Sequence, residues 1–312
     1  MFGVARLYVM LLWLLNEKPD LFLNKMNMYV RGFFTVLAAA SLLAPAIFGQ
    51  SKEQVAITID DLPTLSHGTI DSAEQRAYFR RILVSLKKHK VRAVGFTVGR
   101  SVNPGNRELL AEFLRAGHSL GNHTFSHPDL NKVTPEEFIE DIEQCQKVLL
   151  TNDIAPEYFR YPMLHRGVEE AKRDAVASFL INRALTVAPI TIDSDEVEYN
   201  IRFVRAYYEG NKAEAEEIGK AYVQYMIECC LHFKALAFDL LDRRVRHILL
   251  LHMNFINSFY LDELLTRMRE LGWEFISLKE ALRDPLYEMP DRYRGRRGVS
   301  YLERISNIGM EQ

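Results

Sequence analysis

Residues 54–61 read Gln-Val-Ala-Ile-Thr-Ile-Asp-Asp, a short β-branched run that ends in two aspartates. Such a run, followed directly by polar residues, is typical of a buried strand. From there the chain alternates between strand patterns and helix patterns. This alternation favours a parallel sheet covered by helices, with functional side chains at the carboxyl ends of the strands. We therefore expect an α/β fold with a site at those ends.

The remaining elements follow from the same patterns. Further strands are expected at residues 92–98, 118–122, 157–159, 184–192, 245–251 and 273–276. Helices are expected at residues 72–89, 107–116, 134–150, 167–180 and 261–271, the third of them opening with a capping box and a proline. Residues 200–244 interrupt the rhythm as a long helical stretch broken at Gly210, whose aromatic residues we expect to pack in the core. Residues 284–312 are expected to form an extended surface tail.

Composition limits the class of protein. The chain has 312 residues, of which 48% are apolar and 26% charged, as in a globular protein with a sizeable core. The net charge of -2 gives no reason to expect nucleic-acid binding, which usually shows as a basic face. The three cysteines, two of them adjacent, do not form a disulfide framework.

The first fifty residues resemble an export signal. An apolar run at residues 33–48 follows basic residues, and Ala-Pro-Ala at residues 44–46 is a cleavage signal. We expect a start at Met26 or Met28 and export to the periplasm, the cell envelope or the medium. The alternative is a retained membrane anchor. The domain itself is expected at residues 53–283, after an upstream segment of residues 1–50.

Ionisable residues follow several of the predicted strands. Asp60 and Asp61 are adjacent carboxylates, which repel each other unless a cation or hydrogen bonds compensate. His123 and His127 are four residues apart, so on a helical turn both imidazoles reach one ion. One carboxylate and two imidazoles are the ligand set of a catalytic metal site, and mixed nitrogen and oxygen ligands suit zinc and similar ions.

Three more polar residues end later strands: Arg160, Asp193 and His252. Taken singly, Arg160 has an ordinary structural interpretation as a surface arginine and His252 as a core histidine, just as Asp60 and Asp61 have one as a turn before Pro63. Because five strand ends each present an ionisable group, we interpret them together as one site.

These segments resemble the motifs of the polysaccharide deacetylase family, also known as the NodB-homology domain or carbohydrate esterase family 4. Residues 58–63, Thr-Ile-Asp-Asp-Leu-Pro, resemble its Thr-Phe-Asp-Asp-Gly-Pro motif. His123 to His127 match its second motif, and Arg160-Tyr161-Pro162, residues 193–197 and residues 250–252 resemble the last three. The resemblance covers residues 53–283 and implies a distorted (β/α) barrel of the NodB deacetylase type, here with a helical insertion near residues 200–244.

The resemblance also implies roles. Asp60 is the general base, held by Arg160, and His252 is the general acid. A divalent metal, zinc first with cobalt or nickel as alternatives, is bound by Asp61, His123 and His127. His252 is oriented by a carboxylate of the fourth motif: Asp193 is named as a site residue, and Asp195 and Glu196 stay open for the same role. The expected reaction is removal of N-acetyl or O-acetyl groups from a glycan such as a chitin-like polymer, peptidoglycan or xylan. No obligate protein partner is expected.

The chain departs from the family pattern at the substrate side. Leu62 replaces a glycine, Met163 replaces a tyrosine, and the fourth motif has no tryptophan. Two alternative functions therefore stay open: hydrolysis of small non-sugar amides or imides, and glycan binding without catalysis. Retention of both Asp60 and His252, which a binding protein does not need, argues against the second.

Overall fold

Strand β1, Glu53–Leu62, pairs with three other strands of a seven-stranded parallel sheet in a computed structural model that describes residues 52–63 and 72–306. The strand order is β5-β4-β3-β2-β1-β6. Strand β7 pairs with the first half of β1, β2 with its second half, and β6 with most of its length. The other strands are β2 Val94–Thr97, β3 Ser119–Asn122, β4 Tyr158–Phe159, β5 Thr186–Val187, β6 Arg246–His252 and β7 Trp273–Ile276.

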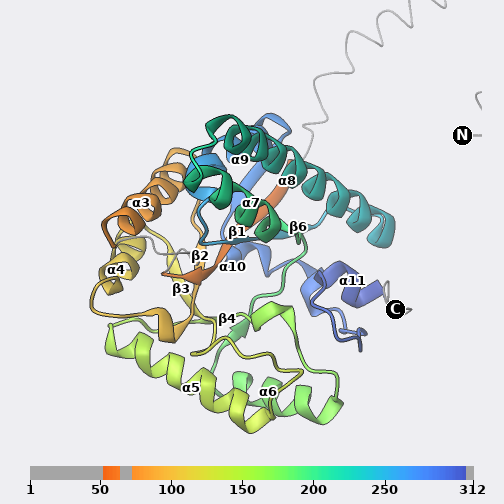
Figure 1. The fold of residues 1–312 in the computed structure, drawn as a ribbon. Helices are drawn as coiled ribbons and strands as arrows, with labels where there is room; N and C mark the ends of the chain where they lie inside the picture. The colour runs from red at the N-terminus through yellow and green to blue at the C-terminus, as the bar shows by residue number, and fades with distance from the viewer. Residues whose placement is uncertain (1–51, 64–71, 307–312) are drawn as a thin grey trace, which may run out of the picture. The chain divides into compact units, whose positions relative to one another are not determined.

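Helices surround the curled sheet, which confirms the predicted distorted barrel (Figure 1). The α-helices are α3 Ser72–Lys88, α4 Arg107–Arg115, α5 Pro135–Thr151, α6 Glu170–Asn182, α7 Glu196–Tyr208, α8 Lys212–Leu241, α9 Asn257–Glu270, α10 Leu278–Ala281 and α11 Tyr301–Ser306. Short 3-10 turns are η1 Gly99–Ser101, η2 Pro162–Leu164 and η3 Pro285–Glu288. The predicted capping box opens α5, where the Thr134 hydroxyl accepts from the Glu137 N–H at 3.2 Å and the Glu137 carboxylate accepts from the Thr134 N–H at 2.8 Å.

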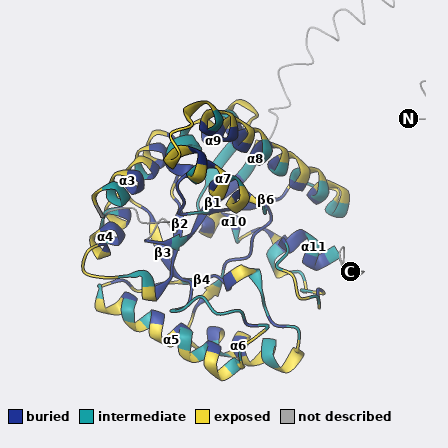
Figure 2. Cartoon of the chain, viewed as in Figure 1, coloured by how far each residue is buried: buried dark blue, intermediate teal, exposed yellow. Residues whose placement is uncertain are grey.

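The two faces of β1 differ in chemistry. Val55, Ile57 and Ile59 belong to the large core that packs under α3, α4, α8 and α9. Because side chains alternate along a strand, Thr58 and Asp60 face the opposite side, toward the barrel interior. Figure 2 shows the strands largely buried and the outer surfaces of α5 and α6 exposed. A small, polar inner face on β1 therefore leaves room for further polar side chains inside the barrel.

The helical insertion begins earlier than predicted. Helix α7 starts at Glu196, and the break before α8 falls at Gly210, whose φ of 76° favours glycine. Tyr222 and Phe233 are buried, as predicted for aromatic residues that pack in the core, whereas Tyr207 and Tyr208 are exposed, contrary to that prediction. Among the described residues, no helix is both long and apolar enough to cross a membrane.

The strand expected at residues 184–192 is much shorter than predicted. Only Thr186–Val187 pairs as a strand, and Ile192 forms one isolated bridge to Leu249. Pro189 lies between them and has no N–H for a ladder, which explains the interruption.

The prediction of an extended surface tail is wrong for residues 285–306. Tyr293 and Leu302 are buried, and the Tyr301 N–H donates to the carbonyl of Ile190 at 2.6 Å. Gly298 lies so close to η2 that a Cβ there would meet the Met163 carbonyl oxygen at 2.0 Å. The segment was predicted to be exposed because it is rich in arginine, proline and glycine, but its aromatic residues pack against the rest of the protein. The predicted export segment, residues 1–50, lies outside the described residues.

Candidate active site

The two aspartates of β1 reach the same pocket through a local irregularity of the strand. Asp60 is 3% exposed and faces the barrel interior. Successive strand residues normally point to opposite faces, but the pairing of β1 with β2 shifts between Ile59 and Leu62. Asp61 has a left-handed φ of 69° at this point. The departure from regular strand geometry therefore lets both neighbouring carboxylates serve one site.

The two histidines come together on a loop, not on the helical turn that the spacing suggested. Thr124 and His127 have positive φ values of 65° and 61°, which no helix contains. The loop is held by hydrogen bonds, among them those from the N–H groups of Phe125 and Ser126 to the Asp141 carboxylate of α5 at 2.6 and 2.8 Å. Asp141 is thus a supporting residue that the sequence patterns did not identify.

Asp61, His123 and His127 form a group that could hold a metal ion. One oxygen of Asp61 lies 3.8 Å from Nε2 of each histidine, and the three candidate ligand atoms lie within 4.8 Å of one another. His123 Nδ1 lies 2.9 Å from the Arg160 carbonyl oxygen, so this nitrogen carries the proton and Nε2 presents a lone pair. Burial, with help from His123, lowers the pKa of His127 to about 4, which favours the neutral form that binds metals. The donor set, its orientation and its protonation all fit a divalent cation.

Arg160 lies beside Asp60 inside the barrel. Its guanidinium is 3.7 Å from the Asp60 carboxylate, donates to the Thr58 hydroxyl at 2.9 Å and stacks on Phe96 at 4.7 Å. Arg160 is 1% exposed, and a charge buried so deeply needs a nearby countercharge. The other oxygen of Asp60, Oδ1, is buried without a hydrogen-bond partner among the described residues. The Arg160 guanidinium therefore lies beside one oxygen of Asp60, while the other oxygen is left for a further ligand.

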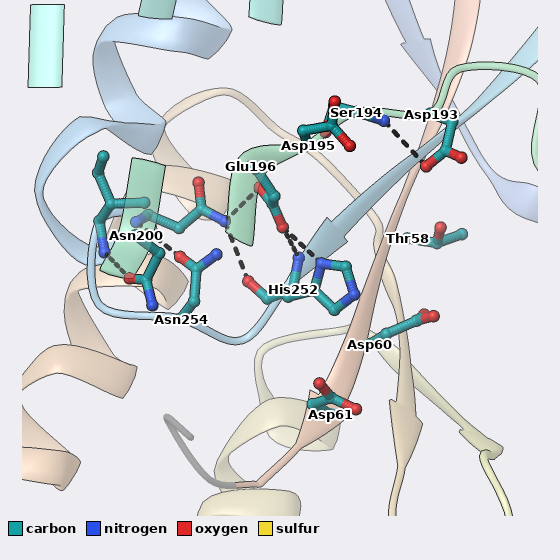
Figure 3. Close-up of polar contacts among 12 residues, drawn as sticks. Thr58, Asp60, Asp61, Asp193, Ser194, Asp195, Glu196, Asn200, His252 and Asn254 are labelled. Atoms are coloured by element: carbon teal, nitrogen blue, oxygen red, sulfur yellow. Dashed lines mark hydrogen bonds and ion pairs between the residues drawn. The ribbon is translucent and has the colours of Figure 1, made fainter. Parts of the chain in front are cut away.

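His252, at the end of β6, is held by Glu196 at the start of α7 (Figure 3). The distance from His252 Nδ1 to Glu196 Oε1 is 2.7 Å, and the same oxygen accepts from the His252 N–H. Asp193 instead accepts from the Ser194 N–H at 2.9 Å. The sequence left three carboxylates as candidates for this contact. The structure brings Glu196 to His252, and Asp193 does not make the contact. The third candidate, Asp195, is exposed.

The charges around His252 favour its protonated form. Burial by itself would lower the pKa of His252, but the hydrogen bond and charge of Glu196, with Asp61 and Asp60, raise it to about 9. Because this pKa lies above 7, His252 at neutral pH is an imidazolium that can give up a proton. Nearby, burial raises the pKa of Asp193 to about 6.

Asp60, His252 and the three candidate metal ligands line one pocket of about 250 Å³. Its wall also includes Met163, Leu250 and Val197, together with two asparagines that the sequence patterns did not identify, Asn200 and Asn254. Both asparagines use their carbonyl oxygens to fix the turn after His252, accepting at 3.0 Å from the N–H groups of Ile256 and Asn257 (Figure 3). The pocket wall near the fourth motif therefore combines these two amides with Val197.

A curled parallel sheet with a carboxylate and two imidazoles at its strand ends defines an α/β protein with a candidate metal site. Residues 49–178 match the family model described as polysaccharide deacetylase. This match spans the first three motifs and supports the family resemblance for that part of the chain.

Curated relatives carry names from the same family. A peptidoglycan-N-acetylglucosamine deacetylase of Bacillus cereus is 31% identical over 134 residues, 42% of this chain and 44% of that protein. A protein of the same name from Listeria monocytogenes is 33% identical over 104 residues, 32% of this chain and 19% of that protein. The chain thus spans less than half the length of these relatives.

Solved structures share the fold. A chitin deacetylase from Colletotrichum lindemuthianum has a TM-score of 0.52 at 20% identity, over 75% of this chain and 89% of that one. A CE4 family pseudoenzyme from Bacillus anthracis has a TM-score of 0.51 at 20% identity, over 74% of this chain and 66% of that one. Since one is a chitin deacetylase and the other a pseudoenzyme, the shared fold alone does not decide activity.

Proposed function

We propose that this protein is a metal-dependent deacetylase that removes acetyl groups from an amino-sugar polymer or another acetylated glycan. One observation carries the proposal: the candidate metal ligands, Asp60 and His252 line the same pocket, and Arg160 and Glu196 hold the last two from behind its wall. The family match and the names of the relatives support the substrate class. A glycan of the cell envelope also agrees with the export that residues 26–50 predict.

The residues on one side of the pocket would bind the metal, activate the water and stabilise the developing negative charge. Asp61, His123 and His127 would hold the cation, which when bound supplies Lewis-acid polarisation of the acyl carbonyl and a lower pKa for the attacking water. Asp60 accepts a proton from that water, with Arg160 keeping its carboxylate in place. The backbone N–H of Met163, on the pocket wall, donates to the acyl oxygen as negative charge develops there.

His252 completes the reaction on the leaving-group side. While its Nδ1 stays bonded to Glu196, its Nε2 donates a proton to the amine nitrogen as the carbon–nitrogen bond breaks. The water oxygen is then part of acetate, and the glycan keeps the free amine.

Acetate release tests the proposal. We expect protein supplied with zinc, cobalt or nickel to release acetate from chitooligosaccharide, peptidoglycan or acetylated xylan, and chelator-treated protein to release none until metal is restored. If no metal supports release from any of the three, the proposed function is wrong. Turnover of small cyclic amides without turnover of glycans would move the substrate class to non-sugar amides.

Substitution of Glu196 by glutamine should shift the pH dependence of this reaction. Since Glu196 raises the pKa of His252, the neutral amide is expected to lower that pKa and move the alkaline limb of the kcat/KM profile down by roughly one to two pH units. Activity in either protein is lost as pH rises through the pKa of His252, because the acid then has no proton to give. Profiles of kcat/KM for wild type and Glu196→Gln over pH 5–10 check this. Superimposable profiles would mean that Glu196 does not set the pKa of the general acid.

A further inference from the structure

The helical insertion reaches the active site through one side chain, Tyr222 of α8. Its ring is buried, and its hydroxyl lies 2.6 Å from Oδ1 of Asn257 and 3.1 Å from Oε2 of Glu196. Asn257 is the first residue of α9, so α7, α8 and α9 meet at this point. The oxygen of Glu196 that does not contact His252 is the one that faces Tyr222 and Asn257.

Three contacts agree on which way the Asn257 amide points, and Tyr222 supplies the one on its oxygen. Because Oδ1 of Asn257 accepts the Tyr222 proton, its NH2 group faces the other side. There it donates to Oε2 of Glu196 at 3.2 Å and to the carbonyl oxygen of His252 at 3.0 Å. A flipped amide would place its oxygen against the Glu196 carboxylate, which is repulsive. The hydroxyl therefore fixes an amide that binds both the carboxylate and the backbone of the acid.

The carboxylate of Glu196 is consequently bound on both oxygens. Oε1 accepts from the backbone and ring of His252, and Oε2 accepts from the Asn257 amide with the Tyr222 hydroxyl beside it. Burial and the charge of Glu196 raise the pKa of Tyr222 well above its usual value, so the hydroxyl keeps its proton. A fully buried carboxylate needs such donors to stay charged and in one rotamer.

We propose that Tyr222 is a positioning residue of the deacetylation reaction: through Asn257 it holds the Glu196 carboxylate against His252 and so maintains the general acid. The insertion thus supplies part of the acid's support, in addition to packing. This inference rests on the proposed function for its kinetic consequence, but the contact network itself can be tested without substrate. The charged and titratable groups that face His252 are Glu196 of α7, Asp60 and Asp61 of β1, His127 of the loop after β3, and Asp193.

Replacement of Tyr222 by phenylalanine removes only the hydroxyl. We expect kcat to fall about tenfold, the typical effect of losing a hydrogen bond at a charged group, with KM and metal content close to wild type. The alkaline limb of the pH profile should also move to lower pH, which a purely structural role would not produce. Tyr199→Phe is the matched control: Tyr199 stands next to the Tyr222 ring, but its hydroxyl makes no hydrogen bond within the described residues, so kcat and the pH profile should not change.

A direct measurement separates this inference from the proposed function. Titration of His252 by NMR, in metal-loaded wild type and Tyr222→Phe, should give a lower pKa in the variant whether or not acetate is released. Equal His252 pKa values would overturn the positioning role, while wild-type protein that releases no acetate would overturn only the proposed function. If Tyr222→Phe unfolds, Asn257→Ala is measured instead, with the same lowered pKa expected and an unchanged pKa again contradicting the inference.

Discussion

Replacing Asp60 with asparagine should lower kcat by about a thousandfold, since a positioned general base contributes roughly 10²- to 10⁴-fold. The substitution keeps the shape of a side chain that is 3% exposed and leaves the candidate metal ligands in place. What it removes is the charge beside Arg160, 3.7 Å away, and the capacity to accept a proton from water. Acetate release under saturating substrate, with metal content measured on the same sample, checks the expectation.

A second buried aspartate provides the control. Asp284 is also paired with an arginine, Arg243 at 2.6 Å, but it lies at the opposite end of β6 from His252. Asp284→Asn can lower stability and is expected to leave kcat near wild type. A kcat for Asp60→Asn within about tenfold of wild type, with metal bound, would mean that another group accepts the proton.

Replacing His127 with alanine should remove metal and activity together. Loss of a residue that only hydrogen-bonds to a metal ligand lowers metal affinity roughly 10- to 100-fold. Loss of a direct ligand is therefore expected to lower metal affinity by more than about a hundredfold. After dialysis, elemental analysis should find about one metal ion per wild-type chain and almost none in the variant. The control is His232→Ala, an exposed histidine of α8 that should keep both metal and activity. An active His127→Ala protein without metal would refute the metal centre.

The sequence predicted the sheet and most of the site because both depend on local pattern. The apolar run before Asp60 and Asp61 and the run before His252 each read as a strand with a polar end, and the structure has β1 and β6 there. Parallel strands bring such ends to one edge, so the convergence followed from fold class alone. The pairing of His123 with His127 was also predicted, although the loop that achieves it was taken for a helical turn.

The parts that the sequence missed depend on contacts between distant segments. Whether Asp193 or Glu196 meets His252 is decided by where α7 begins, and a shift of three residues is below the precision of a pattern. Tyr222 looked like one more core aromatic residue, because nothing near it in the sequence reveals that its hydroxyl faces a carboxylate 26 positions away. Buried polar networks of this kind are a property of the assembled core.

The contact between Gly298 and Met163 has a consequence for the order in which the protein can be completed during synthesis. The candidate metal ligands all lie before residue 128, so the first half of a nascent chain already contains the whole ligand set. The acid at residue 252 and the segment that backs the Met163 turn emerge from the ribosome much later. The ligand set therefore comes from one short part of the chain, while the wall of the pocket at Met163 depends on a contact with a segment far along it.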